Sequence, residues 1–127
     1  MKAHAAGVAF LRSTSIASLA VAADAVITTG AGYPLDLTFY QCGKGITAAQ
    51  HVVKPGGRIL ILGECAEGIG SPEFAHKLRN FTGNEQYLRE IANSPVIPDQ
   101  WQLEKIALVG LTNELFFHAP VSYTHLH

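Results

Sequence analysis

Two short runs of apolar, β-branched residues constrain the fold of this chain more than any other feature. They are Asp24–Thr29 (DAVITT) and Arg58–Gly63 (RILILG). Their length and composition are typical of buried strands. Between them, residues 37–53 repeat apolar side chains at helical spacing and stop before a strong turn signal, residues 54–57 (KPGG). Strand, helix and strand within about 40 residues predict a βαβ unit with parallel strands and a right-handed crossover.

The remainder of the chain predicts further helices and a third strand. Asp36 can cap the helix that begins at Leu37. Further helices are expected over residues 1–20, at Pro72–Arg79 after a Ser71 cap, at Asn84–Ala92, and from an Asp99 cap to about Leu108, with a strand at Asn113–His118. The expected fold class is α/β: a truncated, three-layer Rossmann-like domain with a mostly parallel sheet, spanning residues 1–119. Residues 120–127 (PVSYTHLH) fit nothing before them and are expected to be a non-native tail.

Composition narrows the class of protein. The chain has 127 residues, of which 48% are apolar and 15% charged, which indicates one folded domain. A net charge of −1 without a basic cluster argues against a nucleic-acid partner. No apolar run is long enough to span a membrane, and residues 17–23 are a poor signal peptide. Two cysteines without metal or redox spacing suit a reducing compartment, so we expect a cytoplasmic protein.

The predicted strands end in two glycine-containing loops that are expected to border one crevice. These loops are Gly30–Asp36 and Glu64–Ser71, and ligands of open α/β sheets bind beyond the carboxyl ends of the strands. On the helix after the first loop, Gln41 and Lys44 lie three residues apart, away from the apolar stripe. An amide beside an ammonium group suits a small hydroxycarboxylate. A solvated helix face is the alternative interpretation of this pair.

Glycines and other reactive residue types add weaker signals. Gly43 and Gly45 flank Lys44 inside a predicted helix, which indicates that something approaches the backbone there, such as a cofactor or a second domain. Cys42 falls on the apolar stripe and is expected in the core, whereas Cys65 could face the crevice but has no evident activating base. The most natural interpretation of Glu64 and Glu67 is a solvated loop.

Other site types fit the sequence poorly. The segment 30–34 (GAGYP) lacks the third glycine of a dinucleotide fingerprint, and Pro34 removes a backbone donor. The six histidines do not form a pair at metal-binding spacing, apart from His125 and His127 on the doubtful tail, so we expect no metal site made within this chain.

Residues Thr28–Phe74 resemble the C-terminal domain of the nickel-dependent lactate racemase family. The resemblance rests on the ordered motifs GYPLD, YQxxKG and KPGG and extends more weakly over about residues 3–118. It implies an active site between two domains and a nickel-pincer nucleotide held mainly by an N-terminal domain that this chain lacks. It also implies hydride transfer from the α-carbon of a 2-hydroxyacid such as lactate, with histidines of the missing domain as acid and base.

The resemblance assigns roles to four residues of this chain. Gln41 and Lys44 would bind the substrate, and Tyr40 and Trp101 would contact the cofactor. The expected function is the substrate-side domain of a 2-hydroxyacid racemase or epimerase, with the 127-residue fragment inactive by itself. Two alternatives remain open: an NAD-type dinucleotide-binding oxidoreductase domain, and an inert truncated fragment.

Overall fold

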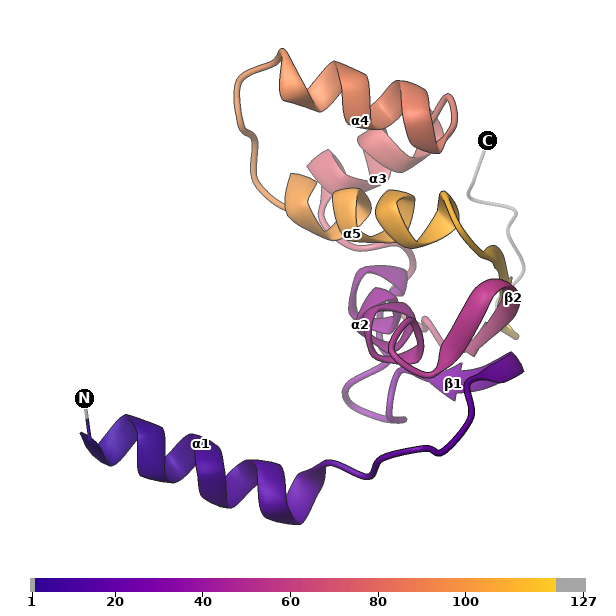
Figure 1. The fold of residues 1–127 in the computed structure, drawn as a ribbon. Helices are drawn as coiled ribbons and strands as arrows, with labels where there is room; N and C mark the ends of the chain where they lie inside the picture. Colours follow the sequence, from indigo (N-terminus) through magenta and orange to yellow (C-terminus); the bar gives the residue numbers. More distant parts are fainter. Residues whose placement is uncertain (1, 121–127) are drawn as a thin grey trace.

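The computed structural model describes residues 2–120 and forms a three-stranded sheet with five helices (Figure 1). Residues 121–127, which make up nearly all of the expected tail, lie outside the described residues. In chain order the elements are α1 (Lys2–Ser15), β1 (Ala23–Thr29), α2 (Phe39–Ala49), β2 (Val53–Leu62), α3 (Pro72–Arg79), α4 (Asn84–Ala92), α5 (Gln100–Gly110) and β3 (Glu114–His118).

The sheet is parallel throughout, in the order β1-β2-β3. The predicted α/β class with a mostly parallel sheet is therefore confirmed, including the βαβ unit built on the two apolar runs. Strand β2 begins at Val53, earlier than predicted, because Val53 already pairs with β1. The next residue of β2 that pairs with β1 is Arg58. Residues 54–57 bulge out of the ladder between these two pairings, and Gly56 adopts a positive φ of 78°. The KPGG turn signal thus marks a bulge inside a strand.

One face of the sheet packs against α2 and carries the hydrophobic core. Side chains alternate between the faces along each strand, and the covered face bears Ile59 and Ile61, which are 0% and 1% exposed. Helix α5 lies against α2, and α3 and α4 pack on α5. Figure 1 shows this stack of helices on one side of the strands. The most deeply buried apolar side chains are Cys42, Ile46, Ile59, Ile61, Phe74, Leu103 and Ala107.

The opposite face of the sheet is open. Ile27, Leu60 and Phe116 form one transverse row across the three strands, and Ile27 and Phe116 are 70% and 47% exposed. Parallel sheets are normally covered on both faces. The helices that contact the sheet in residues 2–120 supply only one of the two outer layers expected from the sequence.

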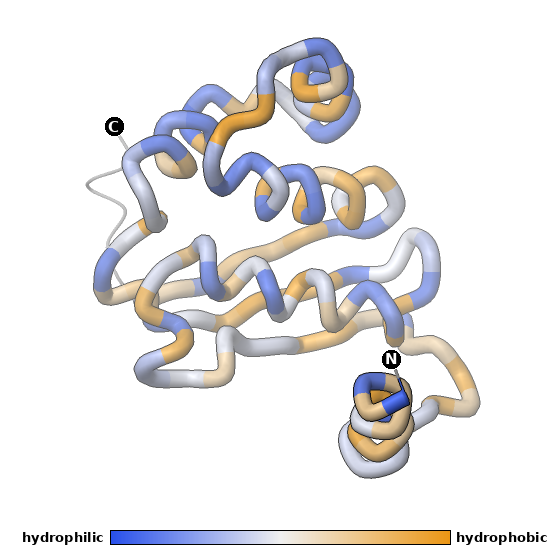
Figure 2. Tube along the Cα trace, turned by 90° about the vertical axis from the view of Figure 1, so that its left-hand side faces the viewer, coloured by the Kyte–Doolittle hydropathy of each residue, from blue (hydrophilic) through white to orange (hydrophobic). Residues whose placement is uncertain are grey.

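Helix α1 stands apart from the rest of the domain. None of its residues is buried, and Phe10 and Leu11 are largely exposed. Figures 1 and 2 show it from two directions as a separate element, joined to β1 by an extended segment. It ends at Ser15, somewhat earlier than the predicted residue 20. Its apolar side chains therefore gain no packing energy from the described part of the chain.

Only one of the three predicted helix caps is made as expected. Ser71 accepts a hydrogen bond from the backbone N–H of Phe74, as the sequence predicted for α3. Asp36 was the wrong choice for α2, since Thr38 provides the cap and accepts from the N–H of Gln41. Asp99 precedes α5 but makes no capping bond, because it has a left-handed backbone and its carboxylate accepts from the Ser71 hydroxyl at 2.7 Å.

Candidate functional site

The two loops that follow β1 and β2 meet, as expected, but they are bonded together. The backbone N–H groups of Phe39 and Tyr40 donate to the carbonyls of Gly68 and Ile69, at 3.0 and 2.9 Å. In the reverse direction, the N–H of Glu67 donates to the carbonyl of Leu37 at 2.8 Å. The second loop therefore satisfies the first N–H groups of α2. The two loops that were expected to border a crevice are therefore held together by backbone hydrogen bonds.

Asp36 joins the same two loops through its side chain. It is 7% exposed, and its Oδ2 accepts from the N–H of Glu64 at 3.1 Å, while its backbone carbonyl accepts from the N–H of Cys65 at 2.9 Å. A carboxylate that bridges loops in this way is not free to cap α2, which explains why the cap falls to Thr38. The second carboxylate oxygen, Oδ1, is buried without a partner.

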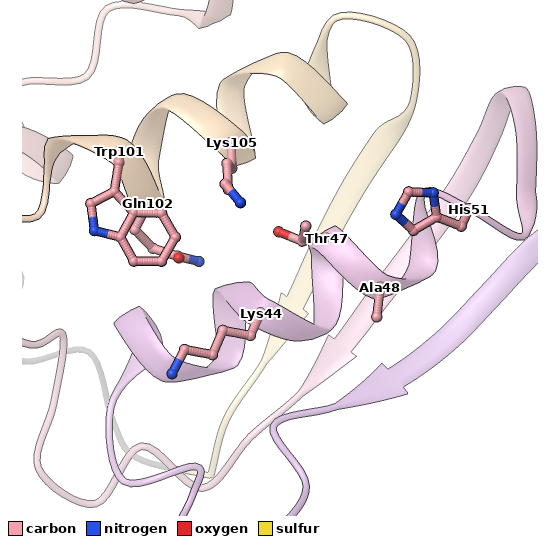
Figure 3. A pocket seen from close by; sticks show the side chains of 7 residues that line it. All are labelled: Lys44, Thr47, Ala48, His51, Trp101, Gln102 and Lys105. Carbon is pink, nitrogen blue, oxygen red and sulfur yellow. The ribbon is translucent and has the colours of Figure 1, made fainter. Parts of the chain in front are cut away.

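A surface groove lies between α2 and α5. A groove of about 410 Å³ runs along the two helices and is lined by Lys44, Thr47, Ala48, His51, Trp101, Gln102 and Lys105 (Figure 3). Lys44 is exposed, and Figure 3 shows its side chain extending in the direction in which the strand arrows point. Two of the four predicted site residues, Lys44 and Trp101, therefore line one groove, and Gly45, next to Lys44, abuts the carbonyl of Thr29 at the carboxyl end of β1.

Tyr40 reaches the same region through an aromatic cluster. Its ring stands edge-on to Trp101 at 6.1 Å and to Phe74 at 5.2 Å between centroids. Trp101 is 44% exposed, so one side of this pair faces solvent. Burial raises the pKa of Tyr40 above its ordinary value, and the Asp99 carboxylate raises it further. The phenol therefore stays protonated at neutral pH and can donate a hydrogen bond.

Gln41 lies one helical turn before Lys44, as its spacing requires, but it does not line the groove. It is partly buried, and its backbone N–H is used by the Thr38 cap. The structure thus places Lys44 and Trp101 on one groove, with Tyr40 in contact with Trp101 behind it, and neither Tyr40 nor Gln41 lines the groove. The sequence analysis missed Gln102 and Lys105. The i, i+4 spacing of Trp101 and Lys105 on α5 was the available signal.

The two glycines beside Lys44 are explained by contacts within this domain, not by a cofactor or a second domain as expected. A Cβ on Gly43 would lie 2.3 Å from Nε2 of Gln102 on α5. A Cβ on Gly45 would lie 2.8 Å from the backbone carbonyl oxygen of Thr29, at the end of β1. Both glycines let α2 pack closely, one against α5 and one against the sheet, and so fix the position of Lys44.

Replacing Gly45 with alanine is expected to destabilise the domain, although alanine is the better helix former by about 1 kcal/mol. The added methyl group would overlap the Thr29 carbonyl, which is backbone and cannot rotate away. We expect a net loss of about 1–3 kcal/mol in the free energy of unfolding, measured by urea titration. Gly7→Ala is the control, because nothing lies within 4 Å of that position on α1. Equal stability of Gly45→Ala and the parent chain would contradict the close packing.

The two cysteines lie side by side in the core. Their sulfur atoms are 3.7 Å apart, and both thiols are free. Cys42 is 0% exposed, as predicted, but Cys65 is only 4% exposed, so the suggestion that it could face the crevice was wrong. Burial, with a smaller contribution from Cys42, raises the pKa of Cys65 to about 12. A thiol of this kind is a poor nucleophile at neutral pH.

Within residues 2–120, no three His, Cys, Asp or Glu side chains gather in an arrangement that could hold a metal ion. None of the helices in this part of the chain combines the length and apolar character needed to span a membrane. The candidate site is therefore defined by its aromatic, amide and cationic side chains.

The structure defines an α/β domain with a groove between two helices on one face of its parallel sheet. Comparison with known proteins identifies its family. Residues 19–118 match the profile of the lactate racemase C-terminal domain. The chain is 34% identical over 118 residues to a lactate racemase of Lactiplantibacillus plantarum, and 33% identical over 117 residues to one of Thermoanaerobacterium thermosaccharolyticum. These matches cover 91% and 90% of this chain.

The chain belongs to the lactate racemase family, in the region of its C-terminal domain, and the predicted resemblance is confirmed. Its fold is similar to that of the lactate racemase apoprotein from T. thermosaccharolyticum, with a TM-score of 0.80, 34% identity and 91% of this chain covered. The chain spans about 28% of the length of the L. plantarum relative and about 27% of the other.

Proposed function

We propose that this domain forms the substrate side of a 2-hydroxyacid racemase, with lactate as the representative substrate. The observation that carries the proposal is that Lys44 and Trp101 line one groove, with the ring of Tyr40 edge-on to Trp101. The two relatives, both lactate racemases, support the reaction class. A chiral assay of a full-length protein that carries this domain tests the proposal. Failure to interconvert D- and L-lactate after loading with nickel and the cofactor would contradict it.

In this proposal Lys44 binds the substrate carboxylate. Its ammonium group is exposed at the mouth of the groove and forms no ion pair within the described residues. A point charge with three donors can neutralise a carboxylate without imposing one geometry. Gln41, one turn earlier on α2, offers an amide that can donate to or accept from the substrate hydroxyl. Together they would hold the α-carbon in a fixed orientation relative to the rest of the active site.

We propose that Tyr40 and Trp101 contact the nickel-pincer nucleotide. The exposed indole of Trp101 offers a flat surface to a pyridinium ring, and the ring of Tyr40 stands edge-on to that indole. These side chains fit the organic part of the group. Ligands for nickel would come from the rest of the protein, given the residues available here. When bound, the cofactor would supply the hydride acceptor, and the residues of this chain would orient the substrate and exclude water.

We propose that the rest of a full-length member of this family, including its N-terminal domain, packs on surfaces that are exposed to solvent in this chain. Two observations support this partner. The row Ile27–Leu60–Phe116 leaves an apolar sheet face open, and α1 has no buried residue. The domain of residues 1–119 would therefore be inactive when it stands alone. The free thiol pair supports a reducing, cytoplasmic location for the whole protein.

Replacing Ile27 with lysine is expected to reduce self-association of the isolated chain. Ile27 lies in the apolar row on the open sheet face, so a positive charge there opposes contact between two copies of the chain. Because Ile27 is exposed, the lysine side chain can extend into solvent. Analytical ultracentrifugation of the 127-residue chain measures the effect. Val96→Lys is the matched control, because Val96 is 88% exposed but lies outside the sheet. If both variants associate to the same extent as the parent chain, the open sheet face is not the surface through which copies of the chain associate.

A further inference from the structure

Polar side chains gather inside the α2–α5 groove, away from the proposed substrate contact at its mouth. Figure 3 shows Thr47, Gln102 and Lys105 directed into the space between the two helices. The three come from facing positions on α2 and α5, and all of them line the groove. None has a role in the proposed function.

Gln102 is the least expected member of this group. It is 0% exposed, and neither its Nε2 nor its Oε1 has a hydrogen-bond partner in the structure. Buried polar atoms are nearly always paired, and leaving one unpaired costs about 1–3 kcal/mol. A buried carboxamide without hydrogen-bond partners, next to a groove, indicates that its partner is a polar group of a ligand bound in the groove.

The charge of the groove defines that partner. Lys105 forms no ion pair within residues 2–120, and its ammonium group lies 5.2 Å from the centre of the Trp101 ring. The groove is lined by a second lysine, Lys44, and by no acidic residue. The Thr47 hydroxyl makes only a long bond, 3.4 Å, to the carbonyl of Gly43. The groove therefore offers more unpaired hydrogen-bond donors than acceptors.

We propose that Lys105, Thr47 and Gln102 form a binding point for an oxyanion, the phosphate or carboxylate group of a small molecule. Lys105 supplies the charge, and the hydroxyl and the amide supply neutral donors. The three side chains lie in a groove of about 410 Å³ that Trp101 also lines. The inference does not depend on the racemase proposal, because oxyanion binding is measurable on this chain alone.

Trp101 gives a direct readout, because it is the single tryptophan of the chain. An oxyanion bound to Lys105 would draw the ammonium group away from the indole and change its fluorescence. The chain is titrated with inorganic phosphate and, separately, with acetate, at constant ionic strength set by potassium chloride. We expect a saturable change with at least one anion, and the anion that gives it identifies the phosphate or the carboxylate class. Absence of a saturable change with both anions would overturn the proposal.

Two variants and a control separate specific binding from a general salt effect. Lys105→Met should weaken binding by about tenfold or more, the usual loss for a charged hydrogen bond. Lys77→Met, on α3 and outside the groove, should bind as the parent chain does. Gln102→Met keeps the side-chain length but removes both unpaired atoms, so it should weaken binding while raising the melting temperature. Unchanged binding in Lys105→Met, or normal binding with a lowered melting temperature in Gln102→Met, would refute the assignment.

Discussion

Lys44→Ala, introduced into a full-length racemase that carries this domain, is expected to lower kcat/KM for lactate racemisation by about 10²–10³-fold. This is the usual effect of removing one charge-stabilising group from a closed active site. Lys44 is exposed here and unpaired within the described residues, so the substitution removes no contact that holds the fold. The loss should therefore appear in a chiral assay of D- and L-lactate without a change in melting temperature.

Lys54→Ala is the matched control for this experiment. Lys54 is also a surface lysine, but it lies near the start of β2, at the other end of the sheet, and pairs with Asp24. An exposed pair of this kind contributes little to stability, so both turnover and melting temperature should stay near those of the parent enzyme. Near-normal turnover in Lys44→Ala would show that the substrate carboxylate is bound elsewhere.

The sheet and most of the helices could be predicted because their signals are local. The runs DAVITT and RILILG are short, apolar and ended by glycine, so they identify β1 and β2 without knowledge of their neighbours. Ser71 followed by Pro72 marks the start of α3 in the same way. Each signal depends on residues within a few positions of one another, and the structure contains the corresponding element.

The wrong helix-cap predictions concern side chains that form a hydrogen bond with a group far away in the sequence. Asp36 and Asp99 are both good N-cap residues, but Asp36 bridges two loops and Asp99 accepts from Ser71. The cap preference is a local property, whereas Glu64 and Ser71 are 28 residues away from these carboxylates. The hydrogen bonds between the loops after β1 and β2 could not be predicted for the same reason, because they join segments whose pairing is not encoded in either one.

The candidate site could be predicted only in part. The spacing of Gln41 and Lys44 placed them one turn apart on α2, but the groove depends on how α5 packs against α2. Gly43 allows α5 to approach through Gln102, and Gly45 allows α2 to lie close to the carbonyl of Thr29 on β1. The two glycines were visible in the sequence as a cost to the helix, yet the sequence alone does not reveal which groups they accommodate.

Phe74→Ala is expected to cause the largest loss of stability, about 3–5 kcal/mol in the free energy of unfolding. Phe74 is 2% exposed, and its ring packs against Tyr40 at 5.2 Å and Phe39 at 6.4 Å. Removing the ring leaves a cavity beneath the pair formed by Tyr40 and Trp101. Urea titration measures the loss, and Trp101 fluorescence should report a looser site before the main unfolding transition.

Phe116→Ala provides the same substitution on a surface, since Phe116 is 47% exposed on the open sheet face. We expect it to cost about 1 kcal/mol or less, with no change at Trp101. The contrast follows from where each ring lies: Phe74 is enclosed by aromatic neighbours, whereas the exposed side of Phe116 has none to lose. Comparable losses in the two variants would mean that the aromatic cluster does not support the site, and Tyr40 would then be held by α2 alone.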